Sequence, residues 1–499
     1  MTMDTAAATD PEEKKRIRWI VFSVAFAVFM VRLDGYIVNI SLPTLARYFQ
    51  VGTSEASWVV LSYLLVVTGS TLIFGKLADR IGLKKIFVWG YGLFALGSLF
   101  CGLSPTIYLL DAARCLQGVG GAMMITSGMA SIPHYLPKNI AGWAFGICSL
   151  ANSLGIMVGA PLGGIITGFI SWRWIFLINV PVGLLAVVIA KRILPPDQTR
   201  PLLAKGRPFD VSGSVLSFIG LAALIFALSR GDDEGWQSGL ILAAFAVAVV
   251  SLLAFYLRER TASDPILNLK IFRNRDFSFA VLTTLVALML LSGGNFLIPF
   301  YLELIKGLRP EHVGAVVMIY SVVYMPIGPF AGRLSDRINP RRLCTVAMFL
   351  AFISCLVFAL TLPMTGMFPV ILYLVLLAVS YALFFPANNH LVMALAPEGS
   401  QGTASAIYTN TMNVGMVLGV CLFEGAFSQA LPAALSNISL NSEVISPSLA
   451  SVVGAFQFAF MVGAFFSLLA FLLSFYSGRH VSAAHDNQGT LPAKKRGGT

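Results

Sequence analysis

Fourteen apolar stretches, each about as long as a bilayer is thick, constrain this chain more than any other feature. A helix that crosses the hydrocarbon core needs about 20 mainly apolar residues. The stretches lie at 18–40, 57–77, 86–104, 107–130, 140–169, 174–192, 210–229, 239–257, 277–302, 312–333, 343–362, 367–396, 402–425 and 453–476. Only 11% of the 499 residues are charged, whereas about a quarter are charged in soluble domains. We therefore expect an all-α polytopic membrane protein.

The distribution of cations predicts how the chain is oriented. Of the 34 Lys and Arg residues, all but seven fall in connections that we assign to the cytoplasm. The exceptions are Arg47, Arg173, Arg230, Lys306 and Arg309 on the outer side, and Arg32 and Arg114 within spans. This bias predicts an even number of crossings, two cytoplasmic termini and a multi-pass protein of the cell inner (cytoplasmic) membrane. The net charge of +11 does not indicate a nucleic-acid partner, because the cations form no stripe.

Two short charged loops are near copies of each other. The sequence Gly75-Lys76-Leu77-Ala78-Asp79-Arg80-Ile81 recurs 257 residues later as Gly332-Arg333-Leu334-Ser335-Asp336-Arg337-Ile338. We expect Gly75 and Gly332 to allow close helix approach. We expect the aspartates to accept hydrogen bonds from the start of a neighbouring helix, where the helix dipole favours an anion. Such a contact would join the two halves on the cytoplasmic side. The alternative is a generic basic loop.

The repeat extends into the spans and predicts the domain organisation. Gly155 and Gly159 match Gly415 and Gly419 at an offset of 260, so spans 1–6 correspond to spans 9–14. We expect two six-helix bundles plus an inserted two-helix hairpin, enclosing a path that opens to one side at a time. The predicted parts are a cytoplasmic N-terminal tail (1–17), a first bundle (18–195), a linker with the hairpin (196–270), a second bundle (271–477) and a disordered cytoplasmic tail (478–499).

Ionisable residues inside the spans are the candidates for ion coupling. Asp34 and Arg114 lie at similar depth on spans 1 and 4, and a charged group there is costly unless it is paired or faces water. We expect them to pair when Asp34 carries no proton; the alternatives are a structural ion pair, or Asp111 as the partner of Arg114. Glu424 is a second candidate proton site or a solvated carboxylate. Glu303 is expected to be solvated.

Polar and aromatic residues within the spans are candidates for the lining of a substrate cavity. Arg32 either reaches a polar neighbour or binds an anionic part of the substrate. The remaining candidates are Tyr36, Asn39, Gln117, Asn152, Asn295, Asn388, Asn389, Tyr408 and Asn410. We expect some of these side chains to join helices rather than contact substrate, because polar groups also hold membrane helices together.

The fifth span is rich in small residues. It carries Gly155, Gly159, Pro161, Gly163 and Gly164. Small residues at this spacing let helices pack backbone to backbone, and a proline bends a helix. We expect this span to act as a hinge or seal between the halves; the alternative is tight packing without motion.

No pattern indicates chemistry on a substrate. The segment from Gly69 to Lys76 resembles a nucleotide phosphate loop, but its spacing is wrong and Leu77 replaces the required Ser or Thr. The six cysteines lie in apolar stretches without a CxxC pair and are read as buried thiols. His134 and His390 have no metal-ligand spacing. We therefore expect no enzyme activity, no metal site and no cofactor.

Several of these motifs together resemble the major facilitator superfamily, and within it the drug:proton antiporter-2 group of fourteen-span multidrug exporters. The resemblance covers nearly the whole chain and is carried by the two loop copies and by residues 33–43, 114–121, 159–164 and 172–183. It implies that Asp34 and Arg114 serve proton coupling, that the Asp79 loop gates and that the Gly/Pro helix confers antiport.

Three positions depart from the family pattern. Ala160 and Pro161 stand in exchanged order relative to the usual Gly-Pro, and Tyr36 replaces a small hydroxyl residue. Arg32 is an unusual cation beside Asp34 and permits an anionic or zwitterionic substrate. We predict a monomeric, proton-driven efflux antiporter for small amphipathic compounds or drugs, of the kind that confers antibiotic resistance. The alternative function is a dedicated exporter of one metabolite, siderophore or amino acid.

Overall fold

The computed structural model describes residues 11–197, 211–261, 269–397, 401–431 and 449–476. Within these ranges every regular element is a helix. The helices are α1 (Pro11–Phe49), α2 (Thr53–Ile81), α3 (Leu83–Leu103), α4 (Ile107–Tyr135), α5 (Lys138–Phe169), α6 (Trp174–Leu177), α7 (Asn179–Ile193), α8 (Val211–Glu234), α9 (Gly239–Thr261), η1 (Leu269–Arg273), α10 (Arg275–Leu304), α11 (Pro310–Arg337), α12 (Pro340–Thr361), α13 (Phe368–Leu395), α14 (Gln401–Ala430) and α17 (Leu449–Tyr476). The predicted tail 478–499 lies outside the described residues.

Helices occur at all fourteen predicted stretches, with α6 and α7 together covering the sixth. Among the described residues, 12 helices are long and apolar enough to cross a membrane. The other two predicted spans, α2 and α4, have 29 residues each, enough to span about 43 Å. α1 begins before the predicted span, and Glu12 and Glu13 in its first turn favour that start because they complement the helix dipole.

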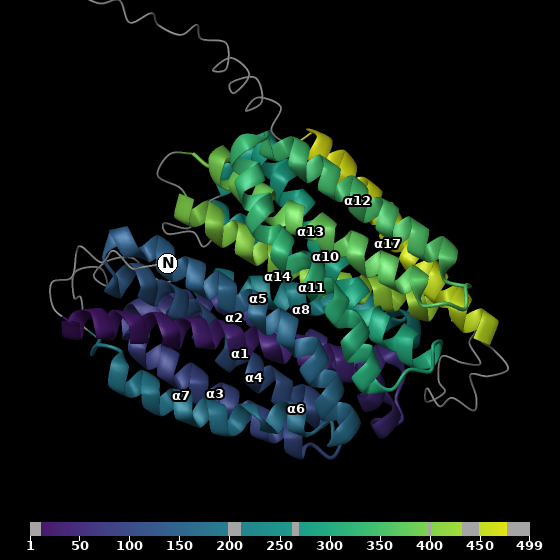
Figure 1. Ribbon diagram of the computed structural model, residues 1–499, viewed down its shortest axis with the longest axis horizontal. Helices are drawn as coiled ribbons and strands as arrows, with labels where there is room; N and C mark the ends of the chain where they lie inside the picture. The colour runs from purple at the N-terminus through teal and green to yellow at the C-terminus, as the bar shows by residue number, and fades with distance from the viewer. Residues whose placement is uncertain (1–10, 198–210, 262–268, 398–400, 432–448, 477–499) are drawn as a thin grey trace, which may run out of the picture.

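The helices form two groups (Figure 1). Helices α1 to α7 lie together in one group, and α10 to α14 lie together with α17 in the other. Within the first group α1 packs on α5, and α3 packs on α4 and α7. Within the second group α10 packs on α14, and α12 packs on α13 and α17. The contacts α1 with α5 and α10 with α14 are equivalent under the sequence repeat, so the repeat is also a repeat of packing.

Two seams join the groups, again as equivalent pairs. α5 packs against α11, and α2 packs against α14. We call the end of the molecule where α1 stops and α2 starts the α1–α2 end, and the opposite end, at Gly82, the α2–α3 end. The hairpin of α8 and α9 lies along the second seam, since α8 contacts both α2 and α14.

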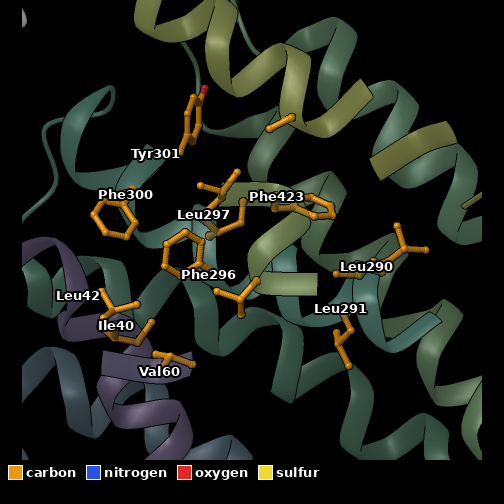
Figure 2. Close-up of a cluster of buried hydrophobic side chains, with 14 of the residues drawn as sticks. Ile40, Leu42, Val60, Leu290, Leu291, Phe296, Leu297, Phe300, Tyr301 and Phe423 are labelled. Carbon is orange, nitrogen blue, oxygen red and sulfur yellow. The ribbon is translucent and has the colours of Figure 1, made fainter. Parts of the chain in front are cut away.

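The hydrophobic core is shared by the two groups at the α1–α2 end. Figure 2 shows Ile40, Leu42 and Val60 near Phe296 and Phe300 of α10, and all five belong to one buried cluster. Towards the α2–α3 end the described side chains form separate clusters. One is built from α1 to α5 and α7, a small one from α2, α3 and α4, and another from η1, α10, α13 and α14. The described core therefore joins the groups at one end only.

Candidate functional site

A network of buried polar side chains surrounds Asp34 in the middle of the first group. Arg114 Nη1 donates to Asp34 Oδ2 at 2.5 Å, and Gln117 Nε2 and Asn179 Nδ2 donate to Oδ1 at 2.8 and 3.0 Å. Asp34 and Arg114 are both 0% exposed. Both carboxylate oxygens of Asp34 accept hydrogen bonds from these side chains, so the protein stabilises the charged form of Asp34 without water.

The guanidinium of Arg114 is held from several sides. Its Nε donates to the backbone oxygen of Val59 on α2 at 2.9 Å, and Nη1 also donates to Gln117 Oε1 at 2.6 Å. Its charged carbon lies 4.1 Å from the centre of the Tyr63 ring, in cation–π contact. Gln117 in turn donates to Ser98 on α3 at 2.8 Å. Five helices therefore fix one ion pair, and removing either charge would leave the other buried and unpaired.

Asn179 is a member of this network that sequence reasoning missed. It is 3% exposed and begins α7, directly after the turn that separates α6 from α7. The residue stands within the 172–183 motif, but only the fold shows that its amide reaches Asp34. The sequence signal that could have identified Asn179 was a polar asparagine at the start of an apolar helix.

Glycines of α5 lie against α1. A Cβ added at Gly155 would lie 3.0 Å from Cβ of Arg32, and one added at Gly159 would lie 2.7 Å from Cβ of Tyr36. Gly163 also lies against the α1 backbone. This stripe of Gly155, Gly159 and Gly163 places the backbone of α5 next to α1, the helix that carries Asp34, so movement of one helix displaces the other.

The adjacent face of α5 meets the second group. A Cβ added at Gly164 would lie 3.1 Å from Cα of Gly314, and one added at Gly314 would lie 3.1 Å from Cα of Pro161. α5 and α11 thus touch backbone to backbone at the α1–α2 end. Small residues on α5 therefore serve both the contact within the first group and the seam.

Charged residues also join the groups at the α1–α2 end. Arg47, in the last turn of α1, forms an ion pair with Glu303 in the last turn of α10. The expectation of a solvated Glu303 was wrong, because its side chain is 1% exposed. Glu424 on α14 is 2% exposed and accepts a hydrogen bond from Thr53 on α2 at 3.4 Å. It is therefore a buried carboxyl at the second seam, not the solvated alternative.

Comparisons with known proteins identify the fold and the family. A sequence model described as Major Facilitator Superfamily matches residues 24–420. The chain belongs to the major facilitator superfamily. It is 32% identical over 416 residues to the riboflavin transporter RibZ of Clostridioides difficile, covering 83% of this chain and 89% of that protein. It is also 32% identical to the putative multidrug resistance protein MdtD of Pectobacterium carotovorum, covering 84% and 89%.

A solved structure has the same arrangement of helices. The inward-facing, unoccupied structure of a bacterial homologue of the human lysosomal transporter Spinster superposes with a TM-score of 0.69. The match covers 95% of this chain and 98% of that one, at 14% sequence identity. The prediction of a major facilitator fold is therefore confirmed, and this polytopic protein is a transporter rather than an enzyme.

The duplicated loops of this facilitator are only partly described. The side chains of Asp79 and Asp336 lie outside the described residues, and Arg80 and Arg337 are exposed. A Cβ added at Gly75 would lie 3.2 Å from Thr126 Cγ2 on α4, in agreement with a close helix approach. No described atom lies within 4 Å of a Cβ added at Gly332, so the described residues show no such approach for the second copy.

A different aspartate binds the helix start next to the first loop. Asp197, just after α7, accepts from the backbone N–H of Lys84 at 2.9 Å and of Lys85 at 3.2 Å, at the start of α3. The ammonium of Lys84 donates to the backbone oxygen of Leu194 at 2.7 Å. Sequence reasoning assigned this kind of contact to Asp79 and missed Asp197, because the partner lies more than a hundred residues away along the chain.

The facilitator's predicted lining residues do not share one environment. Gln117 is buried in the Asp34 network, and Asn388 donates to Thr284 on α10 at 2.5 Å and shares a hydrogen bond with Tyr408. These three side chains join helices. Those that keep partial exposure are Arg32, Tyr36, Asn39, Asn152, Asn295 and Asn410, and Asn389 is exposed.

Proposed function

We propose that this transporter exports small amphipathic compounds or drugs in exchange for protons, by alternating access. The observation that carries the proposal is the Asp34–Arg114 ion pair, which is completely buried inside a helix bundle. Ionisable groups at such depth are costly and mark ion pathways in membrane proteins. The similarity to putative multidrug resistance proteins supports the substrate class.

Asp34 is the proton-binding group in this proposal. As a carboxylate it holds Arg114, Gln117 and Asn179. Protonation removes the charge that attracts the guanidinium, which weakens the contacts between α1 and α4. Each proton that enters along the gradient contributes about 2.3 kcal/mol per 100 mV, enough to bias a two-state equilibrium. Glu424 is proposed as a second group that titrates, at the α2–α14 seam.

We assign the bundles to 18–195 and 271–477, with the hairpin in 196–270 between them. The cation bias places the α1–α2 end on the periplasmic side of the inner membrane and both termini in the cytoplasm. On that assignment the shared core lies at the periplasmic side, and the described bundles have separate cores at the cytoplasmic side. This is an inward-facing arrangement.

Conformational change follows from the two seams. Export requires the α1–α2 end to open, so the backbone contact of Pro161 and Gly164 with α11 must separate. The stripe of Gly155, Gly159 and Gly163 would keep α5 attached to α1 during this motion. The duplicated loops, with Gly75, Asp79 and Arg80 in the first copy and Gly332, Asp336 and Arg337 in the second, would close the cytoplasmic end.

The proposed substrate path runs between α1 and α11. Tyr36 lies close to Tyr324, whose ring stacks on that of Tyr320 with centroids 5.8 Å apart. Asn39 Oδ1 is buried and has no hydrogen-bond partner among the described residues, so it can accept from a ligand. Aromatic rings beside a free acceptor suit a planar compound with a donor group.

The second candidate function is the carriage of one dedicated metabolite. It is favoured by the 32% identity to a riboflavin transporter over most of both chains. Arg32 would then recognise an acidic part of the substrate. A substrate panel in energised vesicles separates the two: resistance to many lipophilic cations supports multidrug export, whereas movement of a single compound supports the dedicated carrier.

The test of coupling uses purified protein in proteoliposomes with an imposed pH gradient. Asp34→Asn should abolish gradient-driven movement of ethidium or riboflavin while the protein stays folded and exchanges substrate at zero gradient. Glu55→Gln is the matched control, because it removes a carboxylate near the α1–α2 end that only caps its own helix. Gradient-driven transport by the Asp34→Asn protein at the rate of the unmodified protein would refute the role of Asp34.

A further inference from the structure

Asp111 is a buried carboxyl group that the network around Asp34 does not use. It is the fifth residue of α4, about 6 Å along the helix from the α1–α2 end. It lies three residues before Arg114, so the two side chains share one face of α4. Asp111 therefore stands between the α1–α2 end and the buried ion pair.

The hydrogen bonding of Asp111 is incomplete. Its Oδ1 is buried and has no hydrogen-bond partner among the described residues, although the residue as a whole keeps partial exposure. Buried carboxylate oxygens almost always have donors, so this atom is available to a donor that arrives in another state. Trp58 Nε1 on α2 is likewise buried without a described partner.

The charged groups around Asp111 are mainly cations. The charges of Arg114 on its own helix and Arg230 on α8 both act on it. The other titratable groups within its reach are the thiols of Cys101 on α3 and Cys115 on α4. The side chain can therefore hold a negative charge between two guanidinium groups.

Arg114 makes a second carboxylate necessary if Asp34 binds a proton. An arginine side chain does not lose its proton in proteins, and Arg114 is 0% exposed. When Asp34 becomes neutral, Arg114 remains a buried cation without its counter-charge, which is strongly unfavourable. Asp111 is the carboxyl one helical turn away on the same helix.

We propose that Asp111 passes protons from the α1–α2 end to Asp34 and then becomes the partner of Arg114. In this step the O–H bond of protonated Asp111 breaks and an O–H bond forms on Asp34, with water carrying the proton between them. Arg114 moves from Asp34 to the new carboxylate, so the number of buried charges is unchanged. Asp34 then releases its proton towards the opposite end and takes Arg114 back, after which hydronium from the α1–α2 end protonates Asp111 again. The inference rests on the proposed proton coupling and adds its route.

The test compares Asp111→Asn, Asp111→Glu and Asp34→Asn in proteoliposomes, with ethidium and riboflavin as transport probes and Glu55→Gln as the control. Asp111→Asn should slow gradient-driven transport about tenfold or more but leave substrate exchange at zero gradient unchanged. Asp111→Glu should restore most of the rate. A merely structural carboxylate would impair exchange as well, and that result would overturn the relay.

A second readout needs no substrate. In an Ile40→Cys background the labelling rate by a membrane-impermeant maleimide reports opening of the α1–α2 end, because Ile40 is 2% exposed. Acidification should raise this rate in the parent and much less in Asp111→Asn. If Asp34→Asn abolishes the effect of acidification on the labelling rate and Asp111→Asn does not, Asp111 is not a proton relay, but Asp34 is still the coupling site. If neither variant changes the response, the proton-coupled function itself fails.

Discussion

Arg47 on α1 and Glu303 on α10 form an ion pair that joins the two bundles at the end where their cores merge. The Glu303 side chain is 1% exposed, whereas that of Arg47 is 34% exposed. The pair is therefore screened less than a surface pair, and removing Arg47 would leave a buried carboxylate without its partner. We predict that it separates when this end opens.

Loss of that ion pair should favour opening. We predict that Glu303→Gln increases maleimide labelling of an Ile40→Cys reporter about fivefold, equivalent to about 1 kcal/mol. Arg47→Lys, which keeps the charge, should change the rate much less. The double exchange Arg47→Glu with Glu303→Arg should recover part of the loss. Equal labelling in Glu303→Gln and its parent would contradict a closing role.

Bulk at the α5–α11 seam should impair transport. In Gly164→Val the added side chain meets the α11 backbone, so the closed end cannot form and the transport rate should fall about tenfold or more. Gly142→Val on the same helix is the control, since no described atom lies within 4 Å of a Cβ there. Transport of ethidium or riboflavin by the two variants, normalised to folded protein, checks this. Similar transport rates in Gly164→Val and Gly142→Val would show that transport does not need close contact between α5 and α11.

Asn179 should tune the pH dependence of transport. Asn179→Leu removes one donor to the Asp34 carboxylate, which destabilises only the charged form. The dependence of gradient-driven transport on pH should therefore differ between Asn179→Leu and the unmodified protein. Ser131→Ala is the control, because it removes a buried hydrogen bond elsewhere on α4. An unshifted profile in Asn179→Leu would exclude a tuning role.

Asp197 should stabilise the start of α3. Asp197→Ala removes the acceptor of two backbone N–H groups, a change that costs about 1–2 kcal/mol at helix N-termini. Hydrogen exchange at Lys84 and Lys85 should speed up about tenfold, while exchange in the middle of α3 stays unchanged. Asp197→Asn, which keeps an acceptor, should show a smaller effect. Uniform acceleration across α3 would point to general destabilisation instead.

The sequence predicted the fold well because membrane helices follow from local composition. All fourteen stretches are helical, and the offset between the repeats appears as equivalent contacts of α5 with α11 and α2 with α14. Pairing of Asp34 with Arg114 was considered because depth in a span can be counted along each helix. The fold was needed to choose Asp34 rather than Asp111 as the partner of Arg114, since both carboxyls are within reach of the same guanidinium.

Other parts of the site could not be read from the sequence because their partners are remote. Nothing local distinguishes Glu303 from a solvated carboxylate at a helix end, and its burial comes from Arg47, 256 residues away. Asn179 and Asp197 likewise acquire their contacts only when α7 packs on α1 and α3. Hydropathy identifies which segments are helices, but not which polar atoms meet between them.

The inserted hairpin makes two otherwise equivalent seams unequal. Along α2–α14, the ring of Phe218 on α8 packs against Gly69, and the ring of Phe226 lies 6.2 Å from that of Trp58. With two equal seams, a compound dissolved in the bilayer could reach the path between the groups from either side. Here the hairpin covers the α2–α14 seam, and we predict that compounds dissolved in the bilayer reach the path between the groups from the α5–α11 side.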